Sequence, residues 1–386
     1  MPVKYPLSMS TFDDKEFNSM IRVINSKNFT MGKKVKIFEK NFSKYIGSRF
    51  AIMVNSGSSA NLLMVAALIY SKNHTLRKGD EVIAPATGWS TSYSPLLQYG
   101  IKIKFVDIDL ATLNYDLSEL KEAVTQKTKA ILIVNVLGNP NDFGKINEII
   151  NGKNIIIIED NCESLGASYA EKMAGSFGLL GSFSFFYSHH ISTMEGGIVT
   201  TDNEELYQIL LSLRAHGWTR DLPHDNIFSN RKNIDSLYDS YRFVLPGYNL
   251  RPTEIQGAIG IQQLKKLPKF INIRKRNAEL FKKLMFNHEH LLMQEEIGSS
   301  SWFAFSLIIK PESNMKRLEL LNQLTELGFE YRPILTGNFT KQEVLKYFDY
   351  EIHNNLDNAN YLHEKGVYIG NYSKSMEDAF LDLSKL

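Results

Sequence analysis

The sequence predicts an α/β protein with a mostly parallel central sheet flanked by helices, followed by a smaller C-terminal α+β domain. Two observations support this prediction. Short apolar runs, such as EVIAPA, IKIKFVDI, KAILIVNVLG and NIIIIED, alternate with helical patterns such as LSELKEAVT and INEIING. The runs are apolar throughout, which is typical of parallel strands that are covered by helices on both faces of the sheet.

The expected elements follow in order along the chain. A helical pattern in KKVKIFEKNFSKYIG precedes a strand-like AIMV, and an apolar helix is expected over Asn61–Tyr70. A wide helical pattern over Glu254–Met285 then leads to a strand in WFAFSLII, a helix over Lys316–Leu327 and a strand in FEYRPI. We expect a large domain over residues 1–250, including an N-terminal segment, and a small domain over residues 251–386. No repeat or long polar linker separates the two.

The composition is that of a globular enzyme and excludes several classes of function. The 386 residues are 43% hydrophobic, and 44 basic against 42 acidic residues leave a net charge of +2, so nothing favours a nucleic acid or an anionic membrane as partner. The single cysteine, Cys162, excludes a disulfide framework and any multi-cysteine zinc or iron–sulfur site within this chain. No signal peptide or membrane span is recognisable, so we expect a cytoplasmic protein.

Active sites of open α/β sheets lie at the carboxyl ends of the strands, and three candidates follow such ends. The segment Ser56–Ala60, SGSSA, offers backbone N–H groups at a helix start for an anion, although a simple helix cap explains it equally. Asp160 follows four isoleucines, so it needs a cationic partner such as a protonated pyridine nitrogen, or it caps a helix. Trp89 could stack on an aromatic ring or pack in the core.

Two further segments carry candidate side chains. Residues 182–197 contain paired histidines and a Gly-Gly beside Glu195, which resembles an active-site turn. Adjacent side chains on an extended chain point opposite ways and no further ligand is spaced correctly, so we expect no metal; a purely structural histidine stays possible. Arg251 of GYNLRP and Arg332 of FEYRPI could bind a carboxylate or phosphate through the planar guanidinium, although most surface arginines bind nothing specific.

The order of these motifs resembles a known family. SGSSAN, APATGWST, FVDID, SFSFF, EGG, RAHG and GYNLRPTEIQGAIG occur in the order found in the fold type I sugar aminotransferases that act on nucleotide-linked keto-sugars. The resemblance runs from about Tyr5 to the C-terminal region. It implies pyridoxal 5'-phosphate as cofactor, with the phosphate held by Gly57, Ser58 and Ser184.

The same resemblance implies roles for four other residues. Asp160 would pair with the pyridinium nitrogen and Trp89 would stack on the ring. Asn249 would reach the phosphate in a neighbouring subunit, which implies a homodimer with shared active sites. Glu163 stands where many relatives carry Gln or His near the ring hydroxyl, and its role stays open.

One position departs from the aminotransferase pattern. Relatives that transfer amines have a lysine five residues after the phosphate-binding serine and six before the Glu of EGG, and both counts lead to His189. FYSHHISTMEGG, TMGKKVK, RAHGWTR and FVLPGYNLRP resemble the exceptional branch of sugar 3-dehydratases in colitose and O-antigen biosynthesis. This branch implies GDP-4-keto-6-deoxy-D-mannose as substrate, loss of its C3 hydroxyl, L-glutamate as amino donor and release of ammonia.

Replacing lysine by histidine changes the expected chemistry. An imidazole cannot form the stable covalent link to the cofactor that a lysine amine forms, so the cofactor should bind non-covalently and favour the pyridoxamine 5'-phosphate form. With a reference pKa near 6.5, His189 suits a general base and acid. The resemblance also implies a substrate cleft. Its expected residues are Thr30, Met31, Gly32, His216, Arg251 and Arg332, although His216 could equally be structural.

Three alternatives remain at this stage. An iron–sulfur-assisted dehydratase acting on a CDP-linked sugar needs several cysteines, and only Cys162 is present. An ordinary sugar aminotransferase would need another lysine, and none lies between Lys172 and Lys232. A catalytically inactive homologue would bind cofactor without turnover. Retention of the cofactor-binding set and of a titratable group at the lysine position argues against such decay.

Overall fold

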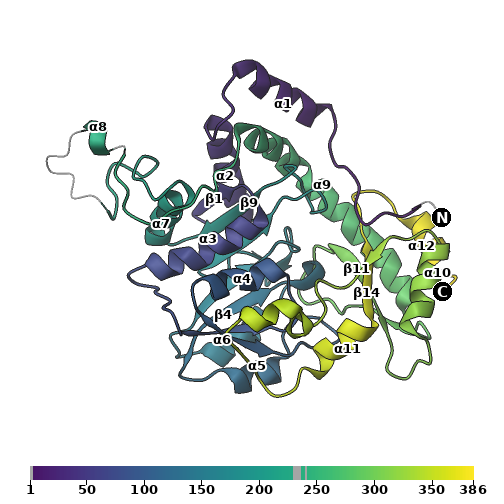
Figure 1. The fold of residues 1–386 in the computed structure, drawn as a ribbon. Coiled ribbons are helices and arrows are strands. Elements are labelled where there is room, and N and C mark those ends of the chain that lie inside the picture. Colours follow the sequence, from purple (N-terminus) through teal and green to yellow (C-terminus); the bar gives the residue numbers. More distant parts are fainter. Residues whose placement is uncertain (1–2, 229–235, 240) are drawn as a thin grey trace.

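The computed structural model describes residues 3–228, 236–239 and 241–386, and its centre is an eight-stranded sheet (Figure 1). In spatial order its strands are β1 (Phe50–Val54), β9 (Gly197–Thr201), β8 (Leu180–Ser184), β5 (Ile156–Asp160), β4 (Thr128–Val134), β2 (Glu81–Pro85), β3 (Lys102–Val106) and β13 (Tyr350–Ile352). The six strands from β8 to β13 are parallel, whereas β9 is antiparallel to both β8 and β1. The predicted mostly parallel sheet is confirmed.

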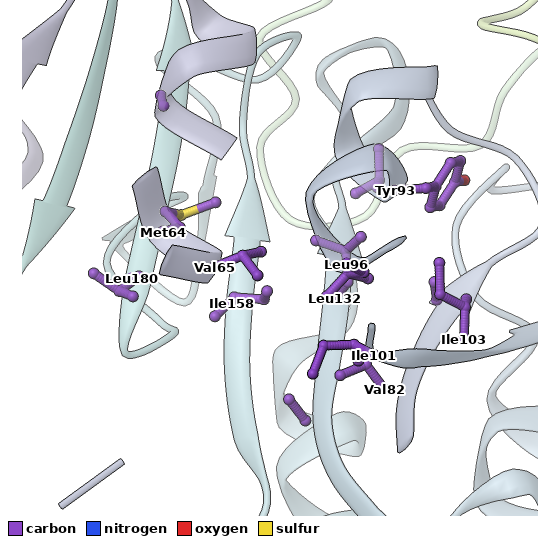
Figure 2. Packing of buried hydrophobic residues seen from close by; sticks show 14 of the residues in the cluster. Met64, Val65, Val82, Tyr93, Leu96, Ile101, Ile103, Leu132, Ile158 and Leu180 are labelled. Carbon is purple, nitrogen blue, oxygen red and sulfur yellow. The ribbon is translucent and has the colours of Figure 1, made fainter. Parts of the chain in front are cut away.

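One face of this sheet is covered by α3 (Gly57–Tyr70), α4 (Ser90–Gln98) and α7 (Glu204–Arg214). Figure 2 shows Met64 and Val65 of α3 beside Ile158 and Leu180 of the sheet. Apolar side chains lie on almost every side of α3, because sheet and helices enclose it. The predicted helix over Asn61–Tyr70 is confirmed, and it begins four residues earlier, within SGSSA.

The opposite face is covered by α2 (Lys33–Ile46), α5 (Leu117–Ala123), α6 (Phe143–Ile150) and the first part of α9 (Glu254–Met285). Alternate strand residues divide between the two cores: Val82 packs toward α3 and α4, and its neighbour Ile83 packs toward α5 and α6. Burial on both faces explains why these strands are apolar throughout.

A second, four-stranded antiparallel sheet follows α9. Its strand order is β10 (Leu291–Leu292), β11 (Ala304–Ile309), β14 (Gly366–Gly370) and β12 (Tyr331–Arg332). The last turns of α9, with α10 (Arg317–Glu326) and α12 (Glu377–Leu383), complete its apolar core. Although β13 returns from this region to the large sheet, the division into domains at residue 251 stays a prediction.

The remaining elements connect these layers. They are α1 (Asp14–Ser26), α8 (Ser236–Asp239), α11 (Asp357–Lys365), the hairpin of β6 (Ser168–Tyr169) and β7 (Lys172–Met173), and the short 3-10 helices η1 (Val136–Gly138), η2 (Phe339–Lys341) and η3 (Glu343–Tyr347). In the described ranges, none of the helices has the length and apolar character needed to cross a membrane.

Candidate active site

A cavity of about 340 Å³ lies at the carboxyl edge of the large sheet, where β4, β5 and β8 end and α3 and α4 begin. The second sheet closes it with side chains from β12 and β14. Eight of the residues predicted from the sequence line this cavity: Gly57, Ser58, Trp89, Asp160, Glu163, Ser184, His189 and Arg332.

The N-terminus of α3 forms one end of the cavity. Ser56 is the N-cap residue and its side chain accepts a hydrogen bond from the Ser59 backbone N–H (3.1 Å), so the cap predicted for SGSSA is present. Gly57 faces Ser184 so closely that a Cβ on Gly57 would lie 2.5 Å from the Ser184 Cβ. Ser58 hydrogen-bonds Thr91 (2.9 Å). Exposed N–H groups and hydroxyls at a helix start suit a phosphate.

Asp160 forms the floor of the cavity at the end of β5. Its Oδ2 accepts hydrogen bonds from Asn61 Nδ2 (2.8 Å) and Ser92 Oγ (2.6 Å), and its Oδ1 accepts one from the Cys162 backbone N–H (3.1 Å). No helix begins directly after Asp160 in the described chain, because the next element is β6 at Ser168, so the capping alternative is wrong. A buried carboxylate held by three donors, facing an open cavity, fits a protonated ring nitrogen.

His189 lies on the turn that follows β8. Its ring packs at a tilt on Phe303, with centroids 5.4 Å apart, and lies 6.3 Å from Phe186. Burial lowers the pKa of His189 to about 4, although the negative charge of Asp160 acts in the opposite direction. The imidazole is therefore neutral near pH 7 and able to accept a proton. Its neighbour His190 is fully buried and does not line the cavity.

Glu163 lies beside Asp160 and has an unusual protonation. Its Oε2 accepts a hydrogen bond from the Leu137 backbone N–H (2.9 Å), which is presented by η1. Burial, reinforced by the nearby charge of Asp160, raises the pKa of Glu163 to about 8. Its carboxyl group is thus largely protonated at neutral pH and able to donate a hydrogen bond into the cavity.

The cavity as a whole fits pyridoxal 5'-phosphate or pyridoxamine 5'-phosphate. The α3 terminus matches a phosphate and Asp160 matches a pyridinium nitrogen. Trp89 is 52% exposed and presents a flat face at the cavity, so the core-packing alternative is wrong. In the described ranges no cluster of three or more His, Cys, Asp or Glu side chains is arranged to hold a metal ion.

The other six predicted residues do not line the cavity and lie near the start of α9. Arg251 Nε donates a hydrogen bond to Asn249 Oδ1 (3.0 Å). The Arg251 guanidinium lies 5.6 Å from the centroid of the Trp218 ring, and the His216 ring centroid lies 5.2 Å from that of Trp218. Thr30 forms a bridge with Thr253, and the Glu254 carboxylate closely approaches Gly32. Met31 lies between the two. Their substrate and cross-subunit roles stay predictions.

Several residues at the site were not anticipated from the sequence. Asn61 was recognisable in principle, because it is a buried amide on an otherwise apolar helix. Ser92, Phe303 and Tyr368 carry no local signal, since only the tertiary fold brings α4 and the second sheet to the cavity.

This fold and this site define the fold type I class of pyridoxal-phosphate-dependent enzymes. Residues 10–382 match the DegT/DnrJ/EryC1/StrS aminotransferase family. The chain is 57% identical to GDP-4-keto-6-deoxy-D-mannose 3-dehydratase of Escherichia coli O55:H7 (strain CB9615 / EPEC), over 97% of each chain. The chain therefore belongs to the DegT/DnrJ/EryC1/StrS aminotransferase family.

Two solved structures are similar over nearly the whole chain. GDP-4-keto-6-deoxymannose-3-dehydratase with a trapped PLP-glutamate geminal diamine has a TM-score of 0.98 at 56% identity and covers 99% of both chains. A mutant of GDP-4-keto-6-deoxymannose-3-dehydratase with bound GDP-perosamine has a TM-score of 0.97 at 56% identity, also over 99% of both chains. These matches agree with the fold and family expected from the sequence motifs.

Proposed function

We propose that this chain is a pyridoxamine-phosphate-dependent sugar 3-dehydratase. It removes the C3 hydroxyl of GDP-4-keto-6-deoxy-D-mannose to give GDP-4-keto-3,6-dideoxy-D-mannose, in the route to colitose and O-antigen. L-glutamate regenerates the pyridoxamine form and is released as 2-oxoglutarate, and its nitrogen is later released as ammonia. The relatives named above carry this activity in their names, and one of them binds a PLP–glutamate adduct.

One observation carries the proposal: an imidazole, rather than an amine, lies in the cavity where transaminating relatives have their lysine. His189 lines the cavity above Asp160, and no lysine side chain lines it in the described part of the chain. Without a lysine amine at this position, the protein can transfer protons but cannot bind the cofactor covalently or take part in transfer of the amino group. That combination favours elimination over transamination of the sugar.

The residues of the chain divide the work. When bound, pyridoxamine phosphate supplies the amine that joins the 4-keto carbon and a ring that withdraws electrons. Asp160 keeps the ring nitrogen protonated. His189, neutral at pH 7, would take a proton from the carbon next to the ring and would deliver one to the departing C3 hydroxyl. Arg332 lies at the mouth of the cavity and is available for the carboxylate of glutamate.

A homodimer is part of the same proposal. Asn249 and Arg251 lie together outside the cavity of their own chain, joined by a hydrogen bond of 3.0 Å. An amide and a guanidinium in this position suit contacts with a phosphate or carboxylate in a partner's cavity. The cytoplasmic location stays a prediction.

The test is to incubate the protein with pyridoxal phosphate, glutamate and GDP-4-keto-6-deoxy-D-mannose and to identify the products by mass spectrometry and an ammonia assay. We expect a sugar that lacks the 3-hydroxyl, with ammonia released. His189→Asn should abolish the product, while His224→Asn, an exposed histidine away from the cavity, should leave it unchanged. Retention of the 3-hydroxyl with nitrogen at C4 would establish aminotransfer instead, and cofactor binding without turnover would establish an inactive homologue.

A further inference from the structure

A buried arginine lies behind the imidazole of His189. Arg274, on α9, is only 4% exposed, and its Nη1 donates to the backbone carbonyl oxygens of Phe303 (2.9 Å), Trp302 (3.4 Å) and Asn371 (2.5 Å). In the described part of the chain, no carboxylate forms an ion pair with it. Burying a guanidinium without a counter-charge is costly, so these carbonyl contacts must be the reason it is tolerated.

Two of the carbonyl oxygens that Arg274 binds, those of Trp302 and Phe303, belong to a strained turn. Trp302 has φ 48°, and facing it Leu137 of η1 has φ 53°, left-handed conformations that residues with a side chain rarely adopt. The turns are tied together by Ser301 N–H to Gly138 O (2.9 Å) and Phe303 N–H to Leu137 O (2.9 Å). Such conformations persist only when the surroundings hold them, and Arg274 is part of those surroundings.

This pair of turns contacts both His189 and Glu163. The Phe303 ring packs against His189 and His190, with centroid distances of 5.4 and 5.6 Å. On the other turn, the Leu137 N–H binds Glu163. A shift of the Phe303 turn would therefore remove the surface on which the His189 imidazole rests.

Arg274 also acts on His189 through its charge. Several ionisable groups surround His189. They are Asp160, Cys162 and Glu163 at and after the end of β5, Glu195 from the turn before β9, Arg332 from β12, Tyr368 from β14, His190 and Arg274. Burial is the main reason that the pKa values of His189 and His190 are low. Asp160 raises the pKa of His189, whereas the positive charge of Arg274 lowers the pKa of both histidines further. The positive charge of Arg274 thus counteracts the effect of the Asp160 carboxylate on the pKa of His189.

We propose that Arg274 is a positioning residue for His189: it holds the Phe303 turn against η1 as a support for the imidazole, and it places a buried positive charge near the imidazole. This inference rests on the proposed function only in taking His189 as the base. Its electrostatic part is testable without any sugar turnover.

The test measures how fast diethyl pyrocarbonate modifies His189 in the full-length protein, by peptide mass spectrometry between pH 5 and pH 8. Only the neutral imidazole reacts, so wild-type protein should react at a nearly constant rate over this range. In Arg274→Gln the positive charge is lost, so the His189 pKa should rise and the rate at pH 5 should fall to about half or less of that at pH 8. Arg276→Gln, an exposed neighbour on the same helix, should behave as wild type.

Two more variants separate charge from position. Arg274→Lys keeps the positive charge but removes the planar guanidinium group. Phe303→Leu keeps Arg274 but removes the aromatic ring on which His189 packs. Both should keep the wild-type pH profile of modification, while kcat for dehydration falls by about tenfold or more at unchanged KM. A folded Arg274→Gln with the wild-type profile overturns the electrostatic role. If Arg274→Gln does not fold, wild-type kcat in both other variants overturns the proposal. Failure of wild-type protein to dehydrate the sugar refutes the proposed function but leaves the modification profiles interpretable.

Discussion

Substituting Gly57 by alanine tests whether the α3 terminus is shaped for a phosphate. An added Cβ would lie 2.5 Å from the Ser184 Cβ, 2.9 Å from its Oγ and 3.2 Å from the Cys162 Sγ. Carbon atoms in contact are normally about 3.5–4.0 Å apart, so the methyl group is about 1 Å too close. Because Ser184 belongs to β8, it cannot yield independently, and α3 must move away from the strand.

The magnitude follows from two opposing effects. Overpacking costs about 1–3 kcal/mol, while alanine in place of glycine in a helix returns up to about 1 kcal/mol. With the full helix gain, the net loss is at most about 2 kcal/mol, which should lower Tm by up to a few degrees. Displacing one N–H contact to a charged phosphate costs about 1.5–3 kcal/mol, which raises the Kd for pyridoxal phosphate about 10- to 100-fold.

The assay is a titration of the purified protein with pyridoxal phosphate, followed by absorbance, together with thermal unfolding in its absence. Ser58→Ala is the matched control, because it loses a hydroxyl hydrogen-bonded to Thr91 without adding volume. It should weaken binding less and leave Tm nearly unchanged. Wild-type Kd and Tm in Gly57→Ala would refute the assignment of this helix start to the phosphate.

Three further predictions concern buried polar groups. Burial raises the pKa of Glu163 from its ordinary value of 4.5 to about 8, so the protein without cofactor should lose stability as pH rises through that window. Between pH 5 and pH 9 the Tm of Glu163→Gln should fall less than the Tm of the wild-type protein. Equal slopes of Tm against pH in the two proteins would contradict this prediction. Asn61→Leu removes a donor 2.8 Å from the Asp160 carboxylate, so the Kd for pyridoxal phosphate should rise about tenfold in the same absorbance titration. An unchanged Kd would show that Asp160 does not need the Asn61 hydrogen bond to bind the cofactor. Lys104 and Glu81 form a buried ion pair (2.9 Å) far from the cavity. Lys104→Met should lower the free energy of unfolding by about 3–5 kcal/mol in denaturant titration, with cofactor affinity unchanged, because it leaves Glu81 unpaired. Adding Glu81→Leu should recover much of this loss, and a loss that persists in the double variant would argue against an unpaired charge as the cause.

Most of the large sheet was predictable from sequence, because its strands are buried on both faces and therefore continuously apolar. Two strands were missed for physical reasons. β9 carries two threonines and runs against the parallel direction, and β13 is a short edge strand whose residues are all exposed. Their pairing depends on segments far away in the chain, which periodicity cannot reveal.

The site was predictable to the extent that its residues follow strand ends. Asp160 and Ser184 end their strands directly, and counting from Ser184 located His189. Two further lining residues are Phe303, directly before β11, and Tyr368 of β14, and no local pattern marks them. The protonation of Glu163 was equally beyond the sequence, since it depends on burial that only the assembled cavity provides.

The antiparallel β9 also dictates an order of assembly during synthesis. β1 has β9 as its partner in the sheet, with Phe50 opposite Thr201, so it emerges from the ribosome long before its partner. The helices α1 and α2 pack on α9, and the Tyr5 backbone N–H binds Gly328 O (2.9 Å). The first fifty residues are therefore synthesised first but are among the last to form their native contacts. Such long-range closure is slow and leaves the apolar face of α2 exposed meanwhile, so the nascent chain is most vulnerable to aggregation until α9 has been made.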